Sequence, residues 1–215
     1  MKKIIIGLVG ETGSGKDTVA KYLKEKYDAK LMRFKDPMEE TLSIFFEKPS
    51  KEDYQWFFKS LHERFGEDIL CKGLRRKIDE SEADLIVVNG LRMPCDYDFI
   101  KDYPDASILY VTADQKMRWQ RVSVRGEKSD DDISFEKFQG LDKHETEIHI
   151  QEIGKKADYI IKNEKDLEYL LSETDNFLAK IKGEEIEVSR EENNSEEDVS
   201  DNKNEDTSGF ERKQI

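Results

Sequence analysis

The chain has 215 residues, of which 36% are hydrophobic and 40% charged, and its formal net charge is −13. This length suits one α/β domain with its own core and is too short for two comfortable ones. The negative charge disfavours general DNA or RNA binding, and no apolar run approaches the ~20 residues that span a bilayer. We therefore expect no nucleic-acid and no membrane partner.

Strands and helices alternate in the hydrophobic pattern. Five apolar runs have the character of strands: Ile4–Val9, Lys30–Phe34, Asp84–Asn89, Ser107–Thr112 and Tyr159–Lys162. Helices are expected in the segments Asp17–Tyr27, roughly 37–81, Asp114–Arg125, one starting near Ser134, and Lys165–Lys182. Strands separated by helices predict a parallel sheet covered on both faces. The helices inserted between the second and third strands are placed to cover a substrate.

The C-terminal segment differs from the rest in composition. From Glu184 to Ile215 it holds 12 acidic and 4 basic residues, and so carries −8 of the net charge. It has almost no large apolar side chains, and such a segment cannot offset its chain entropy by burial. We expect one domain over residues 1–182 and a disordered acidic tail over residues 183–215.

The two cysteines and the N-terminal residues indicate the cellular location of the protein. Cys71 and Cys95 are far apart in the sequence and form no C-x-x-C pair, which favours two reduced thiols in a cytoplasmic protein. The apolar run Ile4–Val9 is too short for a signal peptide, and Glu11 and Lys16 follow it at once.

A glycine-rich segment joins the first strand to the first helix. Its pattern is G-x-x-x-x-G-K, from Gly10 to Lys16. Glycines let the backbone wrap tightly so that N–H groups converge on phosphate oxygens, and a helix N-terminus adds positive potential there. The pattern predicts a phosphate-binding loop (P-loop) for ATP, with Lys16 reaching the β- and γ-phosphates. The expected nucleotide-binding residues are Gly10, Thr12, Gly13, Ser14, Gly15, Lys16, Asp17 and Thr18.

The residue after the lysine departs from the usual motif. A Ser or Thr normally stands there and its hydroxyl binds Mg²⁺, whereas this chain has Asp17, with Thr18 one place later. We assign Asp17 and Thr18 as the candidate metal residues, with Asp17 orienting a magnesium-bound water and Thr18 contacting a phosphate.

Three segments together carry a family resemblance. Gly15-Lys16-Asp17-Thr18, Arg33-Phe34-Lys35-Asp36-Pro37 and Val87-Val88-Asn89-Gly90-Leu91-Arg92 resemble those of deoxynucleoside monophosphate kinases, and also of dephospho-coenzyme A kinase. The likeness runs from about Lys2 to Leu170 and is strongest at the P-loop. It implies a P-loop kinase fold with a five-stranded core, ATP as donor, Mg²⁺ and an arginine-bearing lid.

Arginines on one helix are the candidates for the lid. Arg118, Arg121 and Arg125 are three and four residues apart and so share a helix face, and Gly126 and a polar break follow. A guanidinium is well suited to the charge of a migrating phosphoryl group, and we assign Arg121 and Arg125 as catalytic. The alternative is a solvated basic face.

The acceptor side is less well defined. Arg92 follows the third strand, at the carboxyl edge where open α/β sheets bind ligands, and with Arg33 it is the candidate for holding an acceptor phosphate. Asp36 either contacts the acceptor as a catalytic carboxylate or caps the following helix. Asn89 stands where the resembled kinases place a carboxylate that helps hold magnesium.

The helical insertion is rich in aromatic residues. We expect them to pack mainly among the insertion's own helices, and some to stack on a flat acceptor group. They are Phe45, Phe46, Trp56, Phe57, Phe58 and Phe65.

Three functions fit the sequence. The leading one is transfer of the γ-phosphoryl group of ATP to a (deoxy)nucleoside monophosphate, which needs positioning and charge neutralisation but no general base. In a dephospho-coenzyme A kinase the acceptor is a ribose hydroxyl, and Asp36 would be the base. A nucleotide-binding regulator without catalysis is the non-enzyme alternative, suggested by Asn89 and the acidic tail. The sequence does not indicate an oligomeric state.

Overall fold

The computed structural model describes residues 3–125, 134–141 and 145–184. The chain divides after Glu185, and every element below belongs to the first unit, Met1–Glu185. The predicted acidic tail lies almost wholly outside the described residues, so its disorder and the domain boundary at residue 182 stay predictions. The same holds for the polar break 126–133 of the expected lid.

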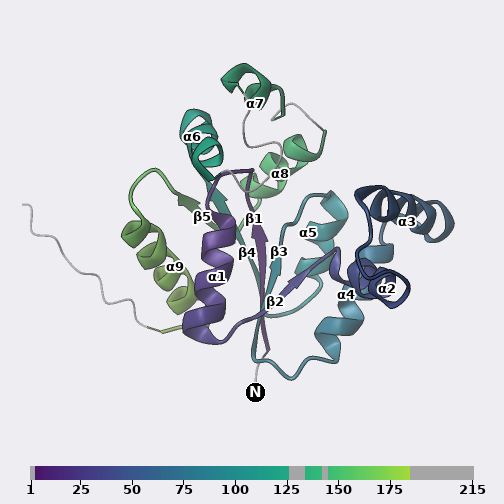
Figure 1. The fold of residues 1–215 in the computed structure, drawn as a ribbon. Helices are drawn as coiled ribbons and strands as arrows, with labels where there is room; N and C mark the ends of the chain where they lie inside the picture. The colour runs from purple at the N-terminus through teal and green to yellow at the C-terminus, as the bar shows by residue number, and fades with distance from the viewer. Residues whose placement is uncertain (1–2, 126–133, 142–144, 185–215) are drawn as a thin grey trace, which may run out of the picture. The chain divides into compact units, whose positions relative to one another are not determined.

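A five-stranded parallel sheet forms the centre of the molecule (Figure 1). Every pairing is parallel and the strand order is β2-β3-β1-β4-β5. The strands are β1 (Ile4–Val9), β2 (Lys30–Arg33), β3 (Leu85–Asn89), β4 (Ala106–Thr112) and β5 (Tyr159–Lys162). All five predicted strands are present, within a residue or so of their expected bounds, and the predicted α/β P-loop kinase-like fold is confirmed.

Helices connect the strands. They are α1 (Lys16–Tyr27), α2 (Asp36–Phe45), α3 (Lys51–Phe65), α4 (Ile69–Asp79), α5 (Pro94–Lys101), α6 (Gln115–Arg125), α7 (Phe135–Leu141), α8 (Glu145–Lys155) and α9 (Leu167–Lys182). The predicted long helical insertion is three helices, α2 to α4. Helix α5 was not expected, because its eight residues are too few for a clear helical pattern. Pro94 at its start and the Asp96 carboxylate nearby fix its N-terminus.

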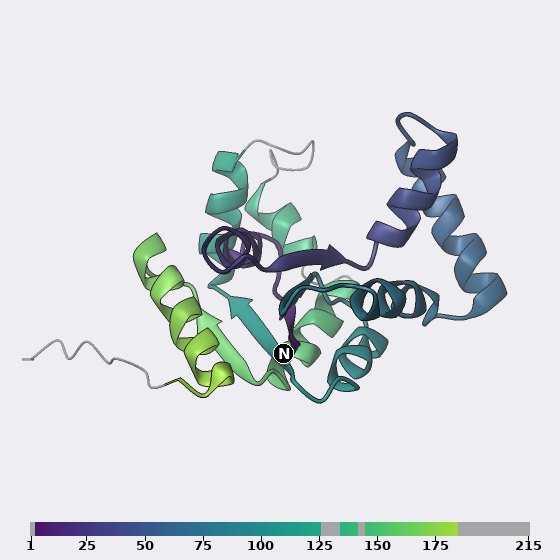
Figure 2. The ribbon, with the colours of Figure 1, turned by 90° about the horizontal axis from the view of Figure 1, so that it is seen from below.

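Two apolar cores lie on opposite faces of the sheet. Because successive side chains of a strand point to opposite faces, Ile5 and Val9 join one core and Ile6 and Leu8 the other. Helices α4, α5 and α8 cover the first face, and α1 and α9 cover the second (Figure 2). Burial on both faces explains why β1, β3 and β4 read as nearly continuous apolar runs.

The aromatic residues of the insertion do not pack as expected. Phe45, Trp56 and Phe65 are 73%, 68% and 56% exposed, and Phe46 and Phe58 are also exposed. Trp56 stacks on its neighbour Phe57, with ring centroids 6.5 Å apart. Helix α3 has no buried residue at all. The expectation of a packed aromatic core in the insertion is therefore wrong: within the described residues most of these aromatic side chains remain exposed.

The carboxyl ends of the strands gather polar residues at one edge of the sheet. The P-loop follows β1, Arg33 ends β2, Asn89 ends β3 and Asn163 follows β5. This edge is where ligands bind in open parallel sheets. Within the described part of the chain, no helix has both the length and the apolar character that a membrane crossing requires.

Candidate functional site

The segment between β1 and α1 forms a tight loop against the neighbouring strands. Gly13 and Gly15 have φ angles of 81° and 101°, in the left-handed region that favours glycine. A Cβ atom on Gly13 would lie 2.6 Å from the Arg118 carbonyl oxygen, and one on Gly15 would lie 2.4 Å from Nδ2 of Asn163. Both positions therefore require glycine for conformation and for space. Helix α1 begins directly after Gly15, so its unpaired N–H groups face the loop.

Two side chains, one from the residue after β5 and one from α6, hold the loop backbone. Asn163 donates from Nδ2 to the Ser14 carbonyl oxygen at 2.8 Å, and its own backbone N–H donates to Thr112 at 2.7 Å. Arg118 donates to the Thr12 carbonyl oxygen at 3.2 Å and to the Ala113 carbonyl oxygen at 3.1 Å. Both side chains are buried. The loop is thus fixed in its shape by hydrogen bonds from outside it.

Arg118 turns toward the loop backbone. It is only 3% exposed, and its guanidinium lies 5.6 Å from the centre of the Phe138 ring of α7. In the described residues it braces the P-loop, and whether it also belongs to a lid stays a prediction, because residues 126–133 lie outside the described part of the chain.

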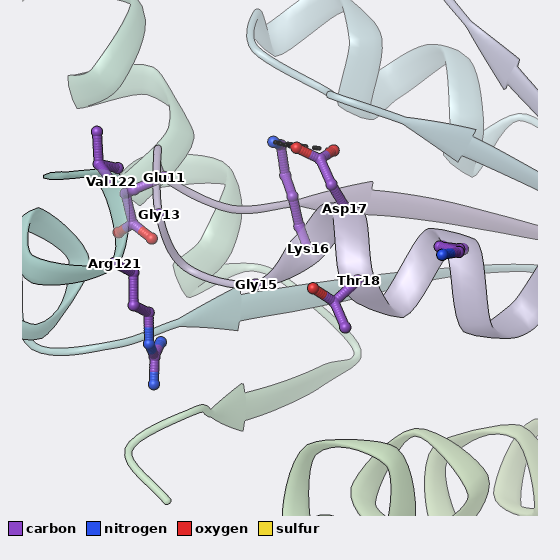
Figure 3. A pocket seen from close by; sticks show the side chains of 9 residues that line it. Glu11, Gly13, Gly15, Lys16, Asp17, Thr18, Arg121 and Val122 are labelled. Carbon is purple, nitrogen blue, oxygen red and sulfur yellow. Dashed lines mark hydrogen bonds and ion pairs between the residues drawn. The ribbon is translucent and has the colours of Figure 1, made fainter. Parts of the chain in front are cut away.

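A cavity of about 580 Å³ opens over the loop (Figure 3). Its lining includes the loop itself, the first turns of α1, and Arg121 and Val122 of α6. Lys16 extends along it and is 16% exposed, and its ammonium group lies 3.2 Å from the carboxylate of Asp17. Asn89 of β3 donates from Nδ2 to the same carboxylate at 2.8 Å. Lys16, Asp17 and Asn89 thus form one polar chain from the loop to β3.

Arg121 stands on the opposite side of this cavity. Its guanidinium donates to the Asn163 carbonyl oxygen at 2.8 Å, while its other terminal nitrogen, NH1, is buried with no partner among the described residues. An unpaired guanidinium nitrogen at a phosphate loop is suited to an anionic ligand. Arg125 ends α6, but its side chain lies outside the described residues, so its assignment stays a prediction.

Glu11 is a residue of the loop that the sequence analysis did not assign. It is 3% exposed, and Oε1 accepts hydrogen bonds from the hydroxyl groups of Tyr110 and, at 3.4 Å, Thr112. Burial and the Glu11 carboxylate raise the pKa of Tyr110, which therefore stays a hydrogen-bond donor. The pair joins the loop to β4. In the sequence, Glu11 could have been recognised from its place inside the P-loop motif. Asn163 could have been recognised only as a polar residue directly after a strand.

Several polar atoms near the loop are buried without a protein partner. Among the described residues they include Oγ of Ser14 and Oδ1 of Asn89. Such atoms are rare unless a ligand, ion or water satisfies them. Asp17 and Thr18 line the first cavity and offer oxygen donors of the kind that Mg²⁺ prefers, whereas Asn89 turns its amide nitrogen toward the Asp17 carboxylate. Asp17 and Thr18 therefore fit that ion.

A second cavity, of about 510 Å³, adjoins the first and shares Asp17 and Lys21 with it. Arg33, Asp36 and Asn89 also line it. The Arg33 backbone N–H donates to Asp36 at 2.7 Å, and its Nε does so at 2.8 Å. Asp36 is the first residue of α2, and its carboxylate binds Arg33. Of the two roles left open for it, capping is not seen, since within the described residues the hydrogen bonds of its carboxylate go to Arg33 and not to an N–H group of α2, and contact with the acceptor stays a prediction.

Arg92 lies on the loop after β3. It is exposed and lines neither cavity, although its backbone N–H donates to Asp96 at 2.8 Å. Of the two residues assigned to the acceptor, Arg33 thus lines a cavity beside the P-loop, and the role of Arg92 stays a prediction.

Comparison with known proteins gives one family model and a set of relatives. A model described as an AAA domain matches residues 6–150. A UPF0200 protein of Sulfurisphaera tokodaii is 29% identical over 82% of this chain and 97% of its own length. One of Saccharolobus islandicus is 30% identical over 76% of this chain and 86% of its own.

Solved structures resemble the fold at low identity. TT1252 from Thermus thermophilus has a TM-score of 0.55 and 21% identity, covering 84% of this chain and 98% of that protein. A shikimate kinase from Acinetobacter baumannii has a TM-score of 0.51 and 17% identity, covering 84% and 94%. At these identities the likeness concerns the fold alone.

Proposed function

The chain belongs to the UPF0200 family and carries an AAA domain, and from this premise we propose that it transfers the γ-phosphoryl group of ATP to a nucleoside monophosphate. The single observation that carries the proposal is the P-loop: a glycine-constrained loop braced from β5 and α6, with Lys16 extending into a cavity of about 580 Å³. Such a loop fits the phosphates of a nucleoside triphosphate.

The donor phosphates would be held by the loop amides, the N-terminus of α1 and Lys16. Lys16 is now paired with Asp17, and a bound phosphate competes for its ammonium group. Arg121 lines the cavity, and its NH1 has no protein partner among the described residues, so a turn of the side chain would let it donate to the migrating phosphoryl group. These groups act by position and charge, which is what a loose phosphoryl-transfer transition state requires.

Magnesium would be held at the first cavity. Asp17 and Thr18 supply oxygen donors there, and Asn89 orients Asp17 through its hydrogen bond. When bound, Mg²⁺ neutralises phosphate charge. Asn89 contributes no charge of its own, so we expect weaker magnesium binding than a carboxylate at this position would give.

The acceptor is proposed to occupy the second cavity, with its phosphate on Arg33. In the transfer, an oxygen of the acceptor phosphate forms a bond to the γ-phosphorus, the bond from that phosphorus to the β,γ-bridging oxygen breaks, and ADP and a nucleoside diphosphate result. An anionic acceptor has no proton to lose. Both oxygens of Asp36 already accept from Arg33, which favours an arginine-positioning role over that of a general base for a ribose hydroxyl.

The test is a panel of acceptors. Purified full-length protein with ATP and Mg²⁺ is assayed for ADP formation with each ribo- and deoxyribonucleoside monophosphate and with dephospho-coenzyme A, and Lys16→Ala is the control. We expect turnover with at least one nucleoside monophosphate, with one nucleoside diphosphate formed per ADP. Turnover of dephospho-coenzyme A alone, abolished in Asp36→Asn, would overturn the choice of acceptor. Tight ATP binding without turnover of any acceptor would favour the regulator.

A further inference from the structure

The fold brings together two cysteines that are 24 residues apart in the sequence. Cys71 on α4 and Cys95 on α5 have their sulfur atoms on either side of the Asp96 carboxylate. Oδ1 of Asp96 lies 3.8 Å from Sγ of Cys71 and 3.9 Å from Sγ of Cys95, and one ligand atom from each of the three residues lies within 4.8 Å of the others. Neither cysteine is in a disulfide.

The Asp96 carboxylate is oriented toward the two sulfurs. Its other oxygen, Oδ2, accepts from the backbone N–H groups of Arg92 and Met93 at 2.8 and 2.9 Å. These bonds leave Oδ1 directed at the cysteines. Asp96 is 8% exposed and Cys71 is 6% exposed, whereas Cys95 is half-buried and leaves a side of the cluster open to solvent.

The Asp96 carboxylate is buried without a charged partner. Within the described residues, no lysine or arginine side chain is within ion-pair distance of it, and its hydrogen-bond donors are two backbone N–H groups and the two thiols. A buried carboxylate without an ionic partner is a place where a cation would be stabilised.

We propose that Cys71, Cys95 and Asp96 bind one thiophilic divalent cation of the zinc type, outside the P-loop site. Zinc takes thiolate ligands at about 2.3 Å and carboxylate ligands at about 2.0–2.2 Å, so that tetrahedral S···O separations are about 3.5 Å. The observed separations need to shorten by only about 0.3–0.4 Å. The open side at Cys95 leaves room for water as a fourth ligand.

A disulfide between the two cysteines is the competing use of the same cluster. The position of Asp96 separates the two: a metal site takes a carboxylate as a ligand, whereas a disulfide needs none, and Oδ1 of Asp96 lies 3.8 and 3.9 Å from the two sulfur atoms. On metal binding each thiol would release its proton.

The place of the cluster gives the cation a structural role. Cys71 belongs to the last helix of the insertion, and Cys95 and Asp96 belong to the first turn of α5. The loop from Asn89 to Arg92 enters that turn, and Asp96 holds its last part by hydrogen bond. A bound cation would fasten the insertion to the loop that leaves β3.

The test uses Co²⁺ as a spectroscopic probe. Full-length protein is purified with reductant, treated with chelator and titrated with Co²⁺ alone. We expect one Co²⁺ per chain with a thiolate-to-cobalt charge-transfer band in the near ultraviolet and the intense visible bands of a tetrahedral site. Zn²⁺ should abolish both and raise the melting temperature. The charge-transfer band separates this site from any oxygen-donor site at the P-loop.

Variants of each ligand complete the test. Cys95→Ser and Asp96→Asn should each weaken Co²⁺ binding by at least about tenfold. Asp98→Asn, an exposed carboxylate of the same helix, is the matched control and should change nothing. Cys71 is buried, so if Cys71→Ser fails to fold, the half-buried Cys95 still provides the measurement.

Two results would overturn the proposal. One is the absence of the charge-transfer band in wild-type protein, or its persistence in Cys95→Ser. The other is a protein that binds no Co²⁺ after reduction but forms a Cys71–Cys95 disulfide in air, which would identify a redox pair instead. Neither result depends on turnover, so the site can fail while the proposed kinase activity stands.

Discussion

The two cavities at the carboxyl edge of the sheet differ in how firmly they are built. On the donor side, the P-loop is held by buried hydrogen bonds from Asn163 and Arg118, and Lys16 is mostly enclosed. On the acceptor side, Arg33 is half-exposed and tied to Asp36 and Glu39 by surface ion pairs. Exposed pairs contribute little to stability, so a ligand can replace them at low cost.

This difference indicates which substrate requires rearrangement. The donor side is preorganised, and ATP would find the loop already shaped. On the acceptor side, Arg33 must break its ion pairs with Asp36 and Glu39 before it can hold a phosphate. The aromatic side chains of the insertion are mostly exposed among the described residues. We expect selectivity for ATP to rest on fixed geometry, and selectivity for the acceptor to depend on movement of side chains and insertion.

The largest expected effect is at Lys16. Lys16→Ala removes the charge that reaches the phosphates and should lower kcat by at least ~10²-fold without loss of fold. Steady-state kinetics measure kcat, and circular dichroism checks that the fold is retained. Lys30→Ala, at the far end of β2 and away from both cavities, is the control. Near-normal turnover in Lys16→Ala would show that the P-loop cavity does not bind the phosphates of the donor.

Arg121 should come next. It lines the cavity and its NH1 has no protein partner among the described residues, so Arg121→Ala should lower kcat by about 10- to 10²-fold while ATP affinity changes less. Arg121→Lys keeps the charge but not the fork of donors, and should recover part of the loss. An equal fall in kcat and in ATP affinity, measured by kinetics and calorimetry, would contradict a role in the transition state.

Asn163 tests the bracing of the loop. Asn163→Ala leaves the Ser14 carbonyl oxygen without its partner and should cost about 1–3 kcal/mol of unfolding free energy, with a loss of turnover of about tenfold. Asn176→Ala on α9, a half-buried amide whose partner is Glu173, is the matched control. Denaturant unfolding measures the free energy of unfolding of both variants. If both variants lose the same stability and neither loses turnover, the donor loop does not need its brace.

The smallest effect is expected in the insertion. Trp56 is 68% exposed, so Trp56→Ser should change the unfolding free energy by no more than about 0.5 kcal/mol. Phe177→Ala, in the fully buried part of α9, should cost about 3–5 kcal/mol. A large loss of unfolding free energy in Trp56→Ser would show that Trp56 is covered in solution and is not available to an acceptor.

The sequence predicted the donor side better than the acceptor side, for a physical reason. The five strands and the P-loop depend on local features, namely apolar runs and glycines followed by a helix. Asn163, Arg118 and Glu11 brace the loop through contacts across 99 to 149 positions in the chain, which no local pattern records. Tertiary contact likewise brought Cys71 beside Cys95.

The most direct measurement is the effect of Arg33→Ala on the two Michaelis constants. ADP formation is measured with ATP varied at saturating acceptor and with acceptor varied at saturating ATP, using the best acceptor of the panel. If the two cavities divide the substrates as proposed, the KM for the nucleoside monophosphate rises at least about tenfold and the KM for ATP stays within about twofold. A rise in the KM for ATP, with the acceptor KM unchanged, would contradict the account.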